Sequence, residues 1–327
     1  MTLEQASQEH WDYIIIGTGI AGSTFGWSLA NRGKKILYIE KGLSSNFKKG
    51  LFPESQLKDF ENPTAHEIEL LKSFGRYSEY VTDESHAPAK KFIPLLGQGA
   101  GGSTLLYGAA LERFFPEDFF PKKYFTYQKE ASLAEWPITY DDLEKYYIQA
   151  EQLYKVYGGV DPLRINSQNH SLLPVKMSID GQSLSNFLTQ KGLHPYRLPV
   201  GHKPRELSEC NGCQAIICIC DDKSDAAQIT LFPSLSLGSS HLLDNCEVLK
   251  LECSYEKVKS VEVKRDSEIK LLGAKKIILA AGVLNTTKIL LNSKNEIWPF
   301  GLGNHSGLVG KNLCRHYMDL LMINNKP

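Results

Sequence analysis

A glycine fingerprint placed between a strand and a helix is the feature that most narrows what this chain can fold into. Residues 13–16, Tyr-Ile-Ile-Ile, form a β-branched run typical of a buried parallel strand, and the segment 17–22, Gly-Thr-Gly-Ile-Ala-Gly, follows directly. A helical stretch then runs to about residue 31, and residues 35–39 predict a second buried strand. Strand, glycine turn, helix and strand within about 30 residues predict one βαβ unit.

The residues of this fingerprint have separate physical roles in a dinucleotide site. Gly17 permits the tight turn, and Gly22 lets the helix pack closely on the strand. Between them, Thr18 and Gly19 offer backbone that a pyrophosphate can approach, at a helix N-terminus that favours phosphate. Glu40 closes the second strand, where a carboxylate accepts hydrogen bonds from ribose hydroxyls and repels a 2′-phosphate. The alternative is a glycine turn with a purely structural role, and the strand–helix context favours the dinucleotide site.

The layout of the later chain bears on whether the dinucleotide is NAD or FAD. An NAD domain would continue with alternating strands and helices over about the next 100 residues, whereas here regular alternation stops after residue 40. Three short alternating strands are predicted only within residues 247–272, and a buried strand at 275–279 leads into a helix at 283–291. This split layout favours FAD. It predicts an α/β chain with an FAD/NAD(P)-binding Rossmann-like fold of the glutathione-reductase type and a three-stranded β-meander.

Between these parts the sequence is less regular. Residues 44–90 predict a loop with a helix around 65–77, and residues 97–110 form a second glycine-rich segment. A helix is expected over 140–157, with Thr139 as its N-cap and an acid three residues later. Its expected apolar face consists of Leu143, Tyr146, Tyr147, Ala150 and Leu153. Residues 158–205 are rich in Gly, Pro and Ser, so we expect an insertion or a crossover between domains there.

Charge and apolar patterning exclude several function classes. The 327 residues carry 37 Lys+Arg against 37 Asp+Glu, so electrostatics do not point to nucleic acid or an anionic membrane as the main partner. No apolar run approaches the roughly 18 residues that a transmembrane segment needs. The first ten residues lack the basic and apolar regions of a secretory signal, which favours a cytoplasmic location.

With these residues in place, the chain resembles the glucose–methanol–choline (GMC) family of FAD-dependent oxidoreductases. The similarity runs from about residue 12 to 317 and includes five stretches beyond the first fingerprint. They are residues 101–108 (GGSTLLYG), 113–119 (RFFPEDF), 136–143 (WPITYDDL), 278–290 (ILAAGVLNTTKIL) and 301–313 (GLGNHSGLVGKNL). The resemblance implies FAD as the cofactor, and oxidation of an alcohol, sugar or sterol-like CH–OH group by hydride transfer to the flavin N5.

The resemblance also implies roles for particular positions. The residues expected to bind the ADP half of FAD are Gly17, Thr18, Gly19, Gly22 and Glu40. Those expected along the pyrophosphate and the flavin ring are Gly101, Gly102, Ser103 and Gly108. Val248 is expected to meet the adenine through its backbone, and Ala281 and Gly282 to pack near the phosphates. A surface loop is the alternative for the segment 101–108, but paired glycines before Leu-Leu-Tyr favour close approach to a ligand.

No catalytic residue is assigned from the sequence. The family's base is a histidine near the C-terminus of the full chain, and no segment here matches it. His316 resembles a position well upstream of that base, so we interpret it as structural, and His194, His202 and His241 have no partner at catalytic spacing. The chain ends at Pro327, before the rest of a substrate domain is expected. Three alternatives follow: the chain is truncated before the family's catalytic histidine, a partner polypeptide supplies the remainder or accepts electrons, or the chain is a non-catalytic flavin-binding remnant.

The cysteines suggest a second, weaker hypothesis. Four of the seven lie at Cys210, Cys213, Cys218 and Cys220, and some dehydrogenases of the resembled family carry an iron–sulfur cluster in a cysteine-rich segment at this place. Asp222 stands where a further cysteine would be expected, and the spacing is not that of a zinc site. We therefore favour buried or locally disulfide-bonded cysteines and assign no metal ligand. The odd, clustered set favours a reducing compartment.

These inferences divide the chain into four parts. Residues 11–157 are expected to form the first part of an FAD-binding domain, and residues 206–318 the second part. Residues 158–205 would be an insertion or the start of an α+β substrate domain, and residues 319–327 the start of its incomplete C-terminal portion. The expected partner is a small-molecule alcohol substrate.

Overall fold

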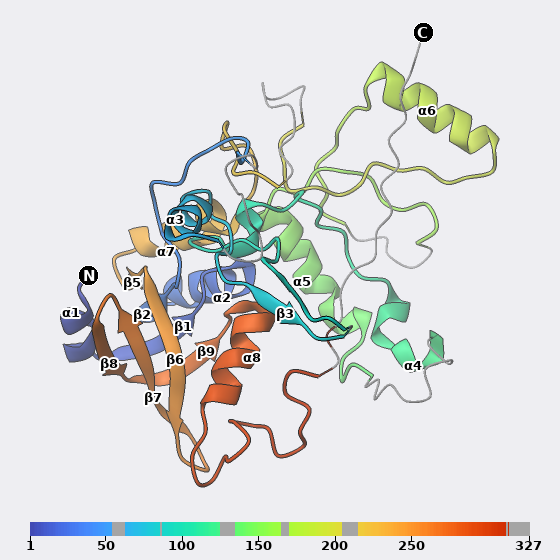
Figure 1. The fold of residues 1–327 in the computed structure, drawn as a ribbon. Coiled ribbons are helices and arrows are strands. Elements are labelled where there is room, and N and C mark those ends of the chain that lie inside the picture. Colours follow the sequence, from blue (N-terminus) through green and yellow to red (C-terminus); the bar gives the residue numbers. More distant parts are fainter. Residues whose placement is uncertain are drawn as a thin grey trace.

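A four-stranded parallel sheet forms the centre of the protein, seen here in a computed structural model (Figure 1). The structure describes residues 1–53, 63–85, 87–124, 135–164, 170–204, 215–311 and 313. The strand order is β5-β2-β1-β9. The strands are β1 (Trp11–Ile16), β2 (Ile36–Ile39), β5 (Ser240–Leu243) and β9 (Ala274–Leu279). This arrangement confirms the predicted α/β Rossmann-like fold.

The two central strands come from the predicted βαβ unit, whose crossover helix is α2 (Ile20–Ala30). Tyr13 of β1 pairs with Ile36 on one side and with Lys276 of β9 on the other. The strand predicted late in the sequence therefore rejoins the first one, as the split layout required. The outer strand β5 was not predicted, because it has only four residues and they show no alternation.

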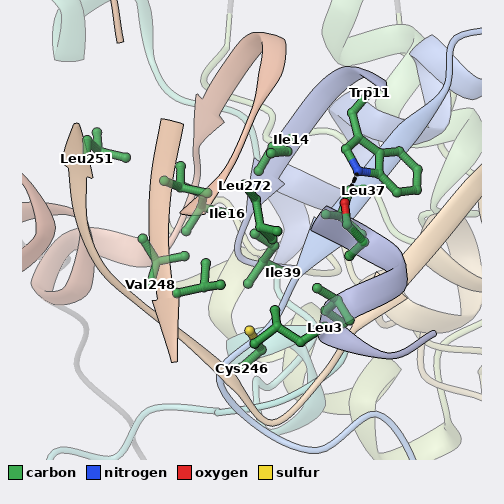
Figure 2. Packing of buried hydrophobic residues seen from close by; sticks show 14 of the residues in the cluster. Leu3, Trp11, Ile14, Ile16, Leu37, Ile39, Cys246, Val248, Leu251 and Leu272 are labelled. Atoms are coloured by element: carbon green, nitrogen blue, oxygen red, sulfur yellow. Dashed lines mark hydrogen bonds between the residues drawn. The ribbon is translucent and has the colours of Figure 1, made fainter. Parts of the chain in front are cut away.

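One face of the sheet is covered by the predicted meander, a separate antiparallel sheet of order β6-β7-β8. Its strands are β6 (Cys246–Cys253), β7 (Val258–Arg265) and β8 (Glu268–Leu272). Helices α1 (Leu3–Gln8) and α8 (Gly282–Asn292) complete this layer. Figure 2 shows the resulting core, in which Leu37 and Ile39 of the sheet belong to one cluster with Val248 and Leu272 of the meander.

Helix α2 and residues 226–236 cover the opposite face. This segment holds a π-helical turn (Ala227–Leu231) followed by α7 (Phe232–Ser236). Ile15, Tyr38 and Leu231 are buried in a second core cluster there. The Tyr38 hydroxyl lies 2.9 Å from Ser234 Oγ, and burial raises the Tyr38 pKa to about 12. Apolar strands buried on both faces are typical of parallel sheets.

The remaining elements lie in the segments that connect the strands. They are α3 (Ala65–Ser73), β3 (Val81–Asp83), β4 (Lys90–Phe92), η2 (Gly102–Leu105), η3 (Pro116–Phe119), α4 (Pro121–Tyr124), α5 (Tyr140–Leu153) and α6 (Ile179–Gln190). Helices α3 and α5 confirm two predictions, although each ends a turn earlier than expected. Helix α6 contradicts the expectation of low regularity in 158–205, and it lies away from the central sheet in Figure 1. Among the described residues, no helix combines the length and apolar character needed to span a membrane.

Candidate cofactor site

A cavity of about 590 Å³ opens at the carboxyl ends of β1, β2 and β9. This is the edge at which parallel α/β sheets bind nucleotides, and the volume lies within the usual range for cofactor sites. The predicted site residues that line it are Gly17, Thr18, Gly19, Glu40, Gly102, Ser103, Val248, Ala281 and Gly282. Segments far apart in the sequence therefore meet around one cavity. Gly22, Gly101 and Gly108 lie outside its lining.

The glycine fingerprint brings the backbone of three segments into close contact. Gly17 has a φ of +96°, and a Cβ atom there would lie 2.4 Å from the carbonyl oxygen of Ala280. A Cβ on Gly22 would lie 2.1 Å from the carbonyl oxygen of Gly17. Real Cβ contacts are never this short, so each position requires glycine for the turn and the helix to fit.

Two helices begin at the cavity wall. Helix α2 starts after Gly19 with Ile20 and Ala21 in the lining, and α8 starts at Gly282. The first N–H groups of a helix have no partner within the helix and carry the positive end of its dipole. The cavity therefore has two helix N-termini directed at it, an arrangement suited to a diphosphate.

The second glycine segment forms the wall opposite the fingerprint. Gly102, with a φ of +56°, begins the short helix η2, and a Cβ there would lie 2.8 Å from the Cα of Gly19. The backbones of the two glycine segments are therefore in contact. A free surface loop, the alternative for this segment, would not make such a contact. The hydroxyl of Ser103, also in the lining, accepts a hydrogen bond of 3.2 Å from the Gly97 N–H.

Glu40 links the glycine fingerprint to the loop after β2 through hydrogen bonds. Its Oε2 accepts hydrogen bonds from the Thr18 N–H at 3.0 Å and from the Thr18 hydroxyl at 2.7 Å. Its Oε1 accepts a bond of 2.9 Å from the Gly42 N–H. Burial raises the pKa of this carboxyl, although these hydrogen bonds act in the opposite direction. Glu40 therefore lines the cavity with its oxygens already bonded to the chain itself.

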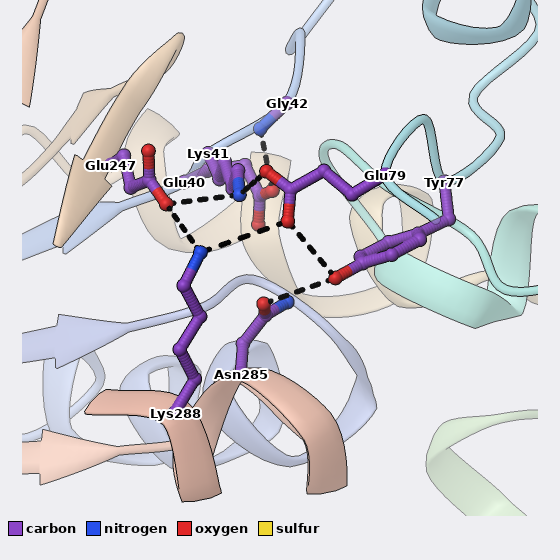
Figure 3. A network of polar contacts seen from close by, with 8 residues as sticks. All are labelled: Glu40, Lys41, Gly42, Tyr77, Glu79, Glu247, Asn285 and Lys288. Atoms are coloured by element: carbon purple, nitrogen blue, oxygen red, sulfur yellow. Dashed lines mark hydrogen bonds and ion pairs between the residues drawn. The ribbon is translucent and has the colours of Figure 1, made fainter. Parts of the chain in front are cut away.

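A network of four charges spans the same end of the cavity (Figure 3). We call Lys41, Glu79, Glu247 and Lys288 the four-charge network. Glu247 Oε1 lies 3.0 Å from Lys41 Nζ and 3.3 Å from Lys288 Nζ, and Lys41 also pairs with Glu79. Burial alone would raise the pKa of Glu79, but Lys41 and Lys288 together lower it. The network links the loop after β2, the segment before β3, strand β6 and helix α8.

Several residues of the lining were missed by the sequence analysis. Lys41, Tyr77, Gln98, Glu247 and Asn285 all line the cavity. Gln98 lies inside the glycine-rich segment 97–110, which was a usable signal. Asn285 lies inside the family-like stretch 278–290, and Lys41 directly follows Glu40. Tyr77 and Glu247 lie in segments whose direction toward the cavity depends on packing, so a single sequence gives no sign of them.

Neither the histidines nor the cysteines of the described chain form a site. No described histidine lines the cavity, and the ring of His241 instead packs edge-on against Trp11 at 5.5 Å. The Cys218 thiol is buried and free and Cys220 is exposed, and no group of metal-ligating side chains is found among the described residues. Cys210, Cys213 and His316 lie outside the described residues.

Comparison with known proteins gives a consistent result. The family model described as GMC oxidoreductase matches residues 11–318. The 6'''-hydroxyparomomycin C oxidase of Streptomyces lividus is 25% identical over 95% of this chain and 55% of its own length. The 2-methyl-1,2-propanediol dehydrogenase of Mycolicibacterium austroafricanum is 26% identical over 96% and 56%.

Among solved structures, an FAD-dependent oxidoreductase from Chaetomium thermophilum superposes with a TM-score of 0.58 at 17% identity. The superposition covers 86% of this chain and 47% of that one, and it supports the fold. The chain thus spans about half the length of the relatives it matches.

Proposed function

Because this chain belongs to the GMC oxidoreductase family, we propose that it is the FAD-binding part of an oxidoreductase that acts on CH–OH groups. FAD is the cofactor that the family implies. The observation that carries the proposal is the cavity itself, in which both glycine segments and the end of β9 meet at the carboxyl edge of the sheet. The two relatives named above are an oxidase and a dehydrogenase whose names include hydroxylated compounds, which supports a small alcohol as substrate.

The residues present fit FAD. Gly19 and Gly102 lie close together and present only backbone atoms to a diphosphate. Helices α2 and α8 add their N-terminal N–H groups. Thr18, Ser103, Ala281 and Gly282 would lie along the diphosphate. Glu40 and the backbone of Val248 would hold the adenosine. When bound, the flavin would accept the hydride from the alcohol carbon.

The chain's own contribution is to bind and orient. Apolar side chains such as Ile16, Ile39 and Leu284 line the cavity. The glycine contacts make the phosphate side rigid, because no side chain there has to move. We assign no base for the hydroxyl proton, since no described histidine lines the cavity.

The domain organisation is also part of the proposal. Residues 11–157 and 206–318 would form the FAD-binding domain, and residues 158–205 and 319–327 would belong to a substrate domain. Strands β1 and β9 of one sheet come from the two proposed halves, which supports joining them. We place the protein in the cytoplasm in this proposal, without nucleic acid as a partner.

A second candidate is a flavin-binding chain that requires a partner polypeptide for catalysis. It is favoured by the absence of a histidine from the described cavity lining. The two candidates share the cofactor and differ only in whether the chain turns over alcohols alone.

The experiment that tests both is purification, reconstitution with FAD and an alcohol-oxidation assay with an artificial electron acceptor. We expect protein with the absorbance of bound flavin, released by denaturation as FAD. Turnover of small alcohols by the chain alone supports the enzyme, whereas bound flavin without turnover supports the partner-dependent chain. Failure to bind FAD after reconstitution contradicts both.

A further inference from the structure

Residues 215–226, which hold two of the clustered cysteines, pack against the wall of the cofactor cavity. We call them the supporting segment. The wall is η2, which presents Ser103 and Thr104 to the cavity. Leu105, the last residue of η2, lies outside the cavity lining and shares an apolar cluster with Ile217 of the supporting segment. The proposed function gives this segment no role.

A buried lysine connects the supporting segment to η2. Lys223 is only 2% exposed, and its Nζ donates hydrogen bonds to the carbonyl oxygens of Leu105 at 3.3 Å and Ile216 at 2.9 Å. Removing an ammonium group from water costs free energy unless hydrogen bonds compensate for it. The carbonyl groups at the end of a helix have no partner within it, so the Leu105 oxygen needs a donor from elsewhere. Lys223 therefore fixes the C-terminal end of η2.

Further hydrogen bonds join the same two parts of the chain. The Ala226 N–H donates to the Thr104 hydroxyl oxygen at 2.9 Å. The Tyr107 hydroxyl donates to the Ser224 carbonyl oxygen at 2.6 Å. Because Thr104 itself lines the cavity, the supporting segment holds a residue of the lining from outside the cavity.

The N-terminal end of η2 is confined by the glycine fingerprint. A Cβ on Gly102 would lie 2.8 Å from the Gly19 Cα, so the two backbones are already in contact and η2 cannot move closer to the fingerprint. Loss of the contacts at the C-terminal end would let η2 move away from it. That movement would widen the gap between the glycine segments and displace Ser103 and Thr104 from the cavity lining.

We propose that Lys223 is a positioning residue for FAD, which acts by holding η2 in the place where Ser103 and Thr104 meet the cofactor. Lys223 lies outside the cavity lining, so its effect passes through the Leu105 carbonyl group. The proposal rests on the proposed function, because it assumes that the cavity takes FAD.

The test compares Lys223→Met with wild type. The dissociation constant for FAD is measured by flavin fluorescence, and the surroundings of the bound flavin are compared by visible circular dichroism. We expect Lys223→Met to weaken FAD binding about tenfold, because hydrogen bonds from a charged donor are lost. We also expect a changed visible spectrum of the bound flavin, which a purely structural role of Lys223 would leave as in wild type.

Two further variants complete the experiment. Lys49→Met is the matched control, because Lys49 forms an exposed ion pair with Asp221 of the same supporting segment. It should bind FAD within about twofold of wild type, with an unchanged spectrum. Tyr107→Phe removes only the hydrogen bond to Ser224. It should weaken FAD binding about two- to threefold and change the spectrum in the same direction as Lys223→Met.

The outcomes separate this proposal from the proposed function. Wild-type affinity and a wild-type flavin spectrum in Lys223→Met overturn the proposal, even if the apoprotein melts at a lower temperature. If Lys223→Met does not fold, Tyr107→Phe decides in the same way, and wild-type affinity and spectrum in that variant overturn the proposal. If wild-type protein binds no FAD, the proposed function fails first, and the role of Lys223 fails with it.

Discussion

Gly17 and Gly22 are positions where the backbone packs too closely for a side chain. A methyl group on Gly22 would lie 2.1 Å from the carbonyl oxygen of Gly17 and 3.2 Å from its carbonyl carbon. Both of these atoms belong to the backbone. Backbone cannot rotate away as a flexible side chain can. The cost of a methyl group at this position would therefore fall on the packing of α2 against β1.

We expect Gly22→Ala to lower the free energy of unfolding by about 1–3 kcal/mol and to weaken FAD binding, because α2 must shift away from the turn. Urea unfolding and FAD titration measure the two effects. Gly273→Ala is the matched control, since a Cβ there meets nothing closer than 3.9 Å. Equal stability of the two variants would show that α2 adapts without strain.

A buried ion pair joins the segment before η3 to helix α5. Arg113 Nε and Nη2 donate to the two Glu151 carboxylate oxygens at 2.6 and 2.7 Å, and both residues are buried. Burial alone would raise the pKa of Glu151, but the Arg113 guanidinium and the Ser171 N–H outweigh it and hold the pKa below 4.5. The pair was not predicted, because the apolar pattern of α5 pointed to a different buried face.

We expect Glu151→Gln to lose about 3–5 kcal/mol of unfolding free energy at pH 7, since Arg113 would keep its charge without a buried counter-charge. The pKa of Glu151 is depressed in the folded state, so its stabilisation is complete above about pH 4.5 and declines as pH falls through the folded-state pKa. Urea unfolding across pH measures this. The control Glu252→Gln breaks an exposed pair and should change stability by less than about 1 kcal/mol.

Among the elements, four that are distant in sequence are joined at the cavity by the four-charge network. Its members carry two positive and two negative charges, so it links the elements without attracting phosphate. Lys288 is about half exposed, with 49% of its side chain accessible, so its ion pairs are screened by salt.

We expect Lys288→Met to raise the FAD dissociation rate about two- to fivefold at low salt, because α8 loses its tie to β6 and the segment before β3. The difference from wild type should shrink as sodium chloride rises to about 1 M, where screening removes the wild-type advantage. Stopped-flow flavin fluorescence measures the rate. Lys250→Met is the control, since its pairs with Glu252 and Glu262 lie within the meander. A salt-independent difference would contradict an electrostatic link.

Sequence periodicity predicted a helix or strand correctly where its apolar residues are also the ones buried in the structure. The strands at 11–16 and 274–279 and the whole meander could be predicted because each is strongly apolar or strictly alternating. Helix α5 was found, but its buried residues are Tyr140 and Glu151. The predicted face included Leu143 and Tyr146, and its burial depends on partners that local periodicity does not encode. Strand β5 has four residues and is defined by its pairing with β2.

At the scale of the whole molecule, the site was predictable only where a motif fixes the backbone. Gly17, Gly19, Gly102 and Glu40 line the cavity because the two glycine segments and the end of β2 place them there. Glu247 depends on how β6 packs against α8 and the loop after β2, so its place could not be derived from one sequence. The resemblance to a known family supplied Val248, Ala281 and Gly282, which the residues alone would not have connected to the first fingerprint.

The central sheet also predicts how the molecule responds to truncation. A chain cut after residue 239 lacks β5, β9 and the meander, so β1 loses one neighbour and Leu37 loses the layer that covers it. We expect no cooperative thermal transition by circular dichroism and no FAD binding, in contrast to the full chain. A cooperative transition in the fragment would show that residues 1–239 contain an independent folding unit.

The pairing of Tyr13 with Lys276 has a consequence for synthesis in the cell. During translation, the first strand and its glycine turn leave the ribosome long before β9 exists, and at about 5–20 residues per second the delay is on the order of tens of seconds. Throughout that interval one edge of β1 is unpaired and half of the cofactor wall is missing. We therefore expect cofactor loading to be a late event in the synthesis of the chain, and the unpaired edge of β1 to be open to association until β9 is made.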